Sequence, residues 1–251
     1  MAPFVEQTFF HYALLSFYLL GPPTFIALRF FQFPYGKHNR VGWGPTISPP
    51  LAWFIMESPS ILLPLILFPS GQHFKNPKAL LLMSPFLLHY FHRTIFYPLR
   101  IYQSTSKQNT KTTIGLNTYL QVRWVSHYKS DYDSDGGLFW WKFFGGLVVF
   151  LWGMRINMWA DTALLVLKSE NGGYKVPRGG WFEVVTCPNY LGEIVEWLGW
   201  AVMTWSWGGL GFFLYTCSNL VPRACASHKW YLEKFGEDYP KNRKAVIPFI
   251  V

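Results

Sequence analysis

The sequence predicts an all-α integral membrane protein, and three observations support that fold class. Of the 251 residues, 51% are hydrophobic and only 14% are charged, whereas soluble domains carry about 25% charged residues. Aromatic residues make up 20%, which is typical of proteins with much surface at a lipid–water boundary. No GxGxxG follows an alternating strand pattern, so a soluble dinucleotide-binding domain is not indicated.

The first two predicted helices are almost free of charge. Residues 7–28 contain no Lys, Arg, Asp or Glu and predict a membrane-spanning helix, interrupted at Gly21-Pro22-Pro23. They do not resemble a signal peptide, because Glu6 is the only early charge and a basic n-region is missing. The next apolar stretch has Glu57 as its one formal charge and predicts a second helix, roughly Pro49 to Pro69.

The later helices are less uniform. Residues 79–99 predict a third helix, and residues 139–160 predict an aromatic-rich span. Residues 197–222 carry no formal charge and, with the preceding turns Tyr190–Glu196, predict two short spans, broken at Trp207-Gly208-Gly209. Residues 101–122 are polar for a membrane span, so we expect a short or distorted fourth element there.

Loop charges predict the orientation in the membrane. Lys and Arg outnumber Asp and Glu by 22 to 13, a net charge of +9. No basic run is long enough for a nucleic-acid surface, so we expect no nucleic-acid partner. The loop after the first helix is basic, residues 161–183 hold Lys168, Lys175 and Arg178, and residues 127–137 are acidic. Because cations mark the cytoplasmic side, this pattern predicts an odd number of spans with the polar tail after Arg223 in the cytosol. The loop charges concerned are Arg29, Lys37, Arg40, Asp131, Asp133, Asp135, Lys168, Lys175 and Arg178.

Ionisable side chains within the apolar segments are candidate functional residues, because they are costly at membrane depth. Glu193 and Glu196 are three residues apart and share a helix face, as do Tyr90 and Arg93. Asp161 follows Asn157 by four residues. A lone buried Glu can also simply pair with an Arg. His89 and His92 lack a third ligand motif, so we expect no metal site.

Motifs along nearly the whole chain are similar to those of one enzyme family. They are Tyr35-Gly36-Lys37-His38, Ala52-Trp53-Phe54 with Glu57, His89-Tyr90-Phe91-His92-Arg93-Thr94, Asn157 with Asp161, Pro177-Arg178-Gly179-Gly180, Asn189-Tyr190-Leu191-Gly192-Glu193 with Glu196-Trp197, and the tail Tyr231–Phe249. In this order they resemble the steroid 5α-reductases (3-oxo-5α-steroid 4-dehydrogenases). The segments PYGKHNRVGWGP and RWVSHYK are similar to those of the plant branch of the family, which reduces brassinosteroid precursors.

The resemblance implies one transmembrane domain over residues 1–251, a multi-pass seven-helix bundle of the endoplasmic reticulum membrane. Residues 1–100 would form helices one to three, 101–137 an atypical fourth element and loop, and 138–251 the cofactor-binding half with its cytosolic tail. The chain departs from the family at 101–122, which is usually apolar. It also has Met56 where steroid-hormone enzymes often have Gln, and it lacks a recognisable cofactor-contacting Asn/Arg stretch after helix three.

The implied reaction is NADPH-dependent reduction of a 3-oxo-4-ene steroid that enters from the bilayer. Negative charge develops on the carbon 3 oxygen, so donors must point at it. The matching donors are Tyr90 and Glu57; Glu57 donates only when protonated, the form that burial favours. The resemblance places the cofactor at Asn157, Asp161, Asn189 and Glu193. Its phosphates need cations, and the candidates on the proposed cytosolic side are Lys168, Lys175, Arg178, Arg223, His228, Lys229 and Arg243. It places the substrate at Trp53, Met56, Arg93, Glu196 and Trp197.

Three other functions are compatible with parts of this pattern. A membrane enoyl-CoA reductase is closest, and an isoprenylcysteine or phospholipid methyltransferase using S-adenosylmethionine shares the C-terminal pattern. A non-enzymatic multispan receptor explains the hydropathy but not the buried carboxyl groups. Glu57 together with the segment His89–Arg93 favours the steroid reductases, and no obligate protein partner is evident.

Overall fold

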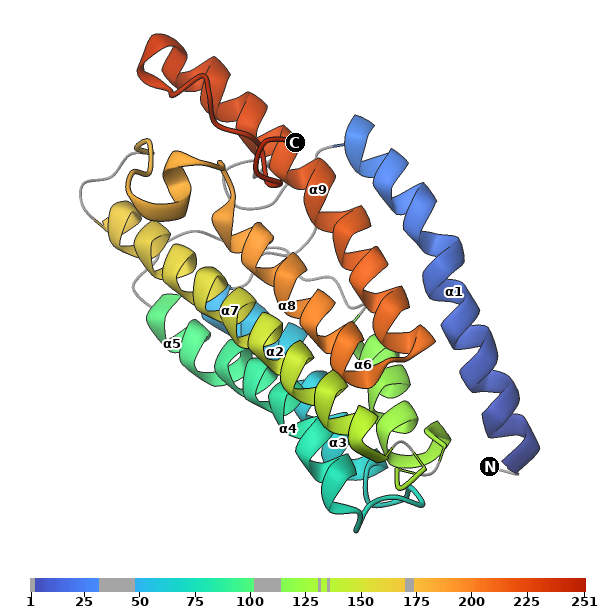
Figure 1. Cartoon of the computed structure of the whole chain (residues 1–251). Helices are drawn as coiled ribbons and strands as arrows, with labels where there is room; N and C mark the ends of the chain where they lie inside the picture. Colours follow the sequence, from blue (N-terminus) through green and yellow to red (C-terminus); the bar gives the residue numbers. More distant parts are fainter. Residues whose placement is uncertain (1–2, 32–47, 102–113, 131, 135, 170–173) are drawn as a thin grey trace.

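The computed structural model describes residues 3–31, 48–101, 114–130, 132–134, 136–169 and 174–251, which form a bundle of helices (Figure 1). Within these ranges there is no β-strand, and an isolated bridge pairs Val185 with Lys244. The helices are α1 (Pro3–Phe30), α2 (Pro49–Glu57), α3 (Pro59–Leu67), α4 (Pro77–Phe91), α5 (Tyr97–Ile101), α6 (Ile114–Arg123), α7 (Gly136–Ser169), α8 (Pro188–Thr204) and α9 (Trp207–Phe235).

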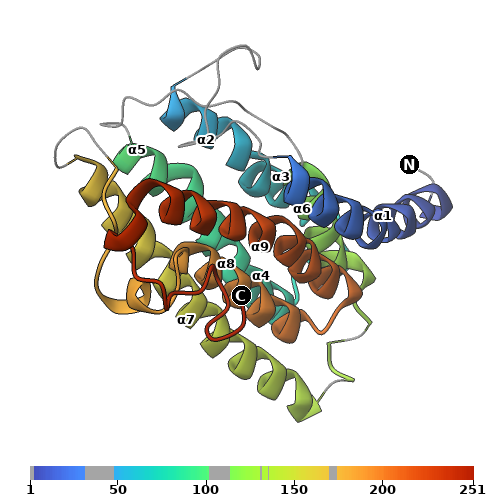
Figure 2. The ribbon, with the colours of Figure 1, turned by 90° about the horizontal axis from the view of Figure 1, so that it is seen from above.

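Two π-helical turns and two 3₁₀ turns complete the described structure. The π-helical turn His92–Phe96 joins α4 to α5, and a second one, Trp124–Tyr128, follows α6. The 3₁₀ turns are Gly180–Glu183, before α8, and Gly236–Asp238, after α9. The views in Figures 1 and 2 agree that α1 lies at the edge of the bundle beside α9.

Within the described ranges, three helical segments are long and apolar enough to cross a membrane: Phe4–Phe30, Pro49–Leu67 and Gly136–Lys168. Their outer faces carry large apolar side chains that are exposed, among them Leu65 (64%), Trp141 (81%) and Val148 (70%). Soluble monomeric proteins rarely expose an apolar surface of this extent. The expected all-α membrane protein is therefore confirmed at the level of helical content and apolar spans.

Two pairs of glycines let α7 and α8 pack backbone against backbone. A Cβ on Gly146 would lie 2.6 Å from the carbonyl oxygen of Gly199, and a Cβ on Gly199 would lie 2.7 Å from that of Gly146. Gly153 and Gly192 form the second pair, with the same separations of 2.6 and 2.7 Å. Small residues allow such close helix contacts in membranes. The second pair brings the Asn157 turn of α7 against the first turns of α8.

The predicted interruption of the first helix is wrong. Helix α1 continues through Pro22 and Pro23 to Phe30. The two prolines remove backbone donors, but their fixed φ is compatible with a helix. Packing against α9 supports the turns that lead into this point: the Phe17 ring contacts the Tyr215 ring, and Gly21 lies against Ser218.

Two other helix boundaries differ from the sequence prediction. The second helix is divided into α2 and α3 at Ser58, because Pro59 cannot donate a backbone hydrogen bond and starts a new helix. The break in residues 197–222 falls at Trp205, which has a positive φ of 46°, and not at Trp207-Gly208-Gly209. Ser206 caps α9 by accepting a 2.8 Å hydrogen bond from the Gly209 amide, and α9 then continues beyond Arg223 as helix.

The expected short fourth element is present as α6, which has ten residues. Its last residue, Arg123, is buried and forms a 2.5 Å ion pair with Glu6 of α1. Arg123 also donates a 3.2 Å hydrogen bond to Ser70. The positive charge of Arg123, which is costly within a membrane span, is therefore paired with the carboxylate of Glu6 in α1. Residues Lys107 and Lys111 of this segment lie outside the described ranges, as do Lys37, Arg40, Asp131 and Asp135.

Candidate active site

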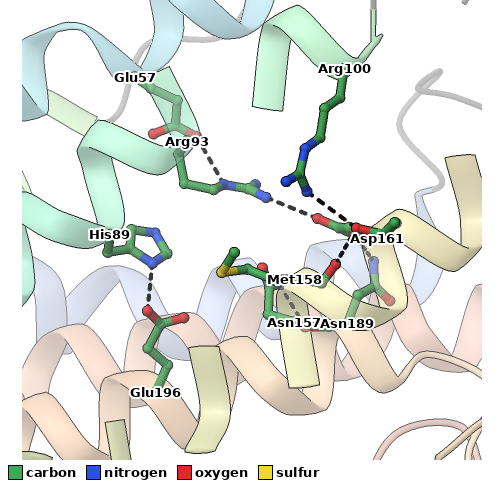
Figure 3. Close-up of polar contacts among 10 residues, drawn as sticks. Glu57, His89, Arg93, Arg100, Asn157, Met158, Asp161, Asn189 and Glu196 are labelled. Carbon is green, nitrogen blue, oxygen red and sulfur yellow. Dashed lines mark hydrogen bonds and ion pairs between the residues drawn. The ribbon is translucent and has the colours of Figure 1, made fainter. Parts of the chain in front are cut away.

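Arg93 is the centre of a buried polar cluster formed by α2, α7 and the π-helical turn after α4 (Figure 3). Its Nη1 donates a 3.1 Å hydrogen bond to Asp161 Oδ2, and its Nε lies 3.9 Å from Glu57 Oε1. All three side chains are buried. Arg93 also interacts electrostatically with Glu193 of α8. One guanidinium thus faces three carboxyl groups from three helices.

Two aromatic rings cover the guanidinium of Arg93. Its Cζ lies 4.4 Å from the Trp53 ring centroid and 4.8 Å from that of Tyr97. The two rings meet edge to face, with their centroids 5.0 Å apart. This cation–π contact fixes the plane of the guanidinium. Trp53 was predicted to contact substrate, and here it contacts the predicted substrate residue Arg93.

A chain of amide contacts links α7 to the start of α8. The Asn189 side chain donates a 3.1 Å hydrogen bond to Asp161 Oδ1, and the Asn157 side chain donates a 2.9 Å bond to the Asn189 carbonyl. The i, i+4 spacing of Asn157 and Asp161 therefore does place both on one helix face, opposite Asn189. Each Asp161 oxygen receives one described donor, from Arg93 or from Asn189.

A second buried pair lies beside this cluster. His89 Nδ1 and Glu196 Oε1 are 2.6 Å apart, and Glu196 is fully buried. The His89 ring contacts the rings of Tyr90 and Trp197, with centroids 4.9 and 4.7 Å away. Glu193 and Glu196 are three residues apart in α8, as noted from the sequence. Glu193 interacts with Arg93, and Glu196 contacts His89.

Tyr90 is buried where the aromatic core meets polar side chains. Its ring packs on Phe86 and Trp197, with centroids 4.6 and 5.8 Å away. Its hydroxyl reaches the side chains of Ser60 and Asn117. Apolar packing on the ring and polar groups at the hydroxyl orient Tyr90 as a hydrogen-bond donor.

Arg243, predicted to bind cofactor, is engaged with the loop between α7 and α8. It is buried, donates a 2.9 Å hydrogen bond to the Pro177 carbonyl and lies 3.3 Å from Glu183 Oε2. Glu183 Oε1 accepts a 2.6 Å bond from the Gly179 amide. That amide, and then Arg243, lowers the pKa of the Glu183 carboxyl. In this arrangement Arg243 holds the loop that precedes α8.

The remaining predicted cofactor residues do not converge on Arg93 through the described contacts. His228 Nδ1 lies 2.5 Å from the Thr186 hydroxyl, and burial followed by Lys244 and Arg243 lowers the pKa of His228. Arg223 is partly buried in α9. Lys168 and Lys175 are exposed at the end of α7 and in the following loop, and Met56 is partly buried one residue before Glu57.

Two residues of the site were not assigned a role from the sequence. His89 was considered only as a metal ligand, and its partner Glu196 is 107 residues away, a distance that one sequence cannot bridge. Tyr97 covers Arg93 and lies four residues after it, so helical spacing alone could have indicated it.

The cluster has more carboxyl groups than cations. Glu57, Asp161, Glu193 and Glu196 accompany Arg93 as the one permanently charged cation in these contacts. Burying several unpaired carboxylates is very costly. Some of these groups must therefore hold protons or meet donors from a ligand, which equips the site to donate hydrogen bonds and transfer protons.

Comparisons with known proteins identify close relatives. The family described as 3-oxo-5-alpha-steroid 4-dehydrogenase matches residues 106–251. A steroid 5-alpha-reductase of Arabidopsis thaliana is 62% identical to this chain, and the alignment covers 100% of both proteins. A steroid 5-alpha-reductase of Gossypium hirsutum is also 62% identical, with 98% of each protein covered. The 3-oxo-5-alpha-steroid 4-dehydrogenase 1 of Rattus norvegicus is 39% identical over 93% of both.

Proposed function

Because this chain belongs to the 3-oxo-5-alpha-steroid 4-dehydrogenase family, we propose that it reduces the 4,5 double bond of 3-oxo-4-ene steroids to 5α-steroids with NADPH. Similarity to plant steroid 5-alpha-reductases favours a step of brassinosteroid biosynthesis. The observation that carries the proposal is the buried carboxyl cluster around Arg93, beside the phenol of Tyr90.

Glu57 and Tyr90 are the proposed catalytic donors to the carbon 3 oxygen. Negative charge moves onto that oxygen when hydride reaches carbon 5, so donors in a dry site lower the barrier. Arg93 holds Glu57 from one side, at 3.9 Å, and the aromatic core holds Tyr90. Trp53, Met56 and Trp197 supply apolar surface for the steroid rings.

The donor set of α7 and α8 fits a nicotinamide nucleotide, which would supply the hydride when bound. Asp161 can accept from ribose hydroxyls, and Glu193 can accept from the nicotinamide amide. Asn157 and Asn189 form a polar wall already fixed by Asp161. Lys168, Lys175, Arg178 and Arg223, at the α7–α8 loop and in α9, supply cations for phosphate groups.

We further propose that the chain crosses the endoplasmic reticulum membrane seven times. The passes would be α1, α2–α3, α4–α5, α6 with its π-helical turn, α7, α8 and the part of α9 before Arg223. Contacts at opposite ends of the bundle support this order. Glu6 and Ser70 meet Arg123 near one end, whereas Thr162 meets Arg100 near the other. A steroid would enter from the lipid between helices.

Product analysis tests the reaction. The purified protein in detergent, given NADPH and a 4-en-3-one steroid, should oxidise NADPH and release one equivalent of 5α-steroid. The same preparation should not transfer a methyl group from S-adenosylmethionine and should not reduce an enoyl-CoA. Methyl transfer, or reduction of enoyl-CoA alone, would assign the chain to one of the alternative classes.

Tag accessibility tests the number of passes. In sealed microsomes, a tag after residue 251 should be labelled from the cytosolic side, and a tag before residue 1 only after the membrane is permeabilised. Labelling of both tags from the same side would mean an even number of passes.

A further inference from the structure

The pair formed by His89 and Glu196 has a geometry suited to holding a proton. It joins α4 to α8 with 2.6 Å between Nδ1 and Oε1, and both side chains are buried. In Figure 3 the imidazole lies between Glu196 on one side and Glu57 with Arg93 on the other. The ring edge that Glu196 does not occupy therefore faces the candidate active site.

The surroundings of Glu196 favour its neutral form. Its second oxygen, Oε2, is buried and has no hydrogen-bond partner among the described residues. Among the described residues, no Lys or Arg lies within ion-pair distance of this carboxyl, and Arg93 acts on it only from farther away. A carboxylate left in this way would lose its solvation without compensation, whereas a carboxylic acid needs only the one contact that it has. In that form Oε1–H donates to Nδ1, and His89 carries its own proton on Nε2.

We propose that His89 and Glu196 supply the proton that the reduction adds at carbon 4, an inference that rests on the proposed function. Hydride addition at carbon 5 leaves an enolate over the carbon 3 oxygen, carbon 3 and carbon 4. The carbon 4–H bond then forms as the Nε2–H bond of His89 breaks, while the Glu196 proton moves from Oε1 to Nδ1. The carbon 3 ketone is restored, and Glu196 is left as carboxylate beside the Nδ1–H of His89. After product leaves, a proton from solvent returns to Nε2 and the Nδ1 proton returns to Oε1, which restores the starting state.

The position of His89 supports this route. Carbon 4 is bonded to the carbonyl carbon whose oxygen Tyr90 would hold. The His89 ring lies edge to face with Tyr90, their centroids 4.9 Å apart, so His89 is next to the residue that would hold that carbonyl. In this assignment His89 is a catalytic residue, and Glu196 is a positioning and proton-supplying residue that acts through it.

The first test is the variant Glu196→Gln, which keeps the shape and a hydrogen bond to Nδ1 but has no acidic proton. We expect kcat to fall about 10²-fold or more, as for loss of a general acid, with a larger solvent deuterium isotope effect. In the wild type kcat should decline at high pH as the pair loses its proton, and the variant should lack that decline. Steroid KM and the NADPH Kd should change little.

A spectroscopic readout tests the proton without turnover. Infrared spectra of the ligand-free protein should contain the C=O stretch of a protonated carboxyl group that shifts in D2O and disappears in Glu196→Gln. If Glu196→Gln does not fold, Glu196→Asp and His89→Gln provide the same kinetic comparison, with Asp retaining part of the activity.

His92→Gln is the matched control. His92 lies in the same segment, is buried, and its Nε2 has no hydrogen-bond partner among the described residues. This variant should keep the wild-type pH profile and isotope effect. A wild type that makes no 5α-steroid would overturn the proposed function. An active wild type whose profile, isotope effect and infrared band are all unaffected by Glu196→Gln would overturn the proton route alone.

Discussion

Arg93 and Asp161 are 68 residues apart in the chain and 3.1 Å apart in the structure, between Nη1 and Oδ2. Through this bond the π-helical turn after α4 is tied to α7, and the same guanidinium reaches Glu57 of α2. The two halves of the chain therefore meet at one buried charge.

Replacing Arg93 by Lys should destabilise the protein although the charge is kept. An ammonium cannot bridge Asp161 and Glu57 or stack in the same way on Trp53. Breaking a buried pair costs about 3–5 kcal/mol, and we expect part of this loss, seen as a lower Tm in detergent. Arg100→Lys is the control, since Arg100 is exposed and donates a 3.3 Å hydrogen bond to the Thr162 hydroxyl. Equal Tm values for both variants would contradict the central role of Arg93.

Glu57→Gln and Tyr90→Phe should each abolish most turnover and leave NADPH binding nearly intact. Each removes one donor to the developing oxyanion, and loss of one such donor costs about 10²–10³ in rate in a well-studied protease. Single-turnover kinetics with a 4-en-3-one steroid measure the loss, and cofactor titration measures binding. Near wild-type turnover in both variants would rule out their assignment.

Arg243→Ala should raise the NADPH Kd more than the steroid KM, and so should Asn189→Ala. Arg243 holds the Pro177–Glu183 loop, so Glu183→Gln should shift the same constant in the same direction. A direct phosphate contact by Arg243 would instead leave the Glu183 variant unaffected. Lys241→Ala is the control, because Lys241 pairs with Glu237 on the exposed tail. An unchanged NADPH Kd in both Arg243→Ala and Asn189→Ala would contradict a cofactor role for either residue.

Gly153→Ala should lower both stability and activity, because its Cβ would meet the Gly192 carbonyl oxygen at 2.6 Å. Helices α7 and α8 would have to separate, which displaces Asn157 from Asn189. Overpacking of this kind costs about 1–3 kcal/mol. Gly145→Ala, eight residues earlier in the same helix, meets nothing within 4 Å and should be neutral or slightly stabilising. The measurement is the Tm of both variants in the same detergent; equal Tm values would contradict the close packing of α7 on α8.

Local sequence patterns predicted the helices and many of the polar residues at the site. Asn157 and Asp161 fell on one face because helical spacing is a local property. The break at Trp205 and the division at Ser58 depend on capping and on proline in ways that hydropathy does not resolve. Continuity through Pro22 depends on α9, and the pairing of His89 with Glu196 depends on the packing of α4 against α8. Contacts between segments that are distant in the chain could therefore not be predicted from one sequence.

The glycine pairs between α7 and α8 also determine which parts of the protein can move. At these two levels no side chain separates the helices, so neither can slide or tilt against the other without a backbone clash. On the microsecond-to-millisecond timescale of substrate exchange, α7 and α8 should therefore behave as one rigid body. Opening of the site to admit a steroid must then come from the facing wall of α2 to α5. Arg93 lies at that boundary, so its ion pair with Asp161 must lengthen or re-form whenever this wall moves.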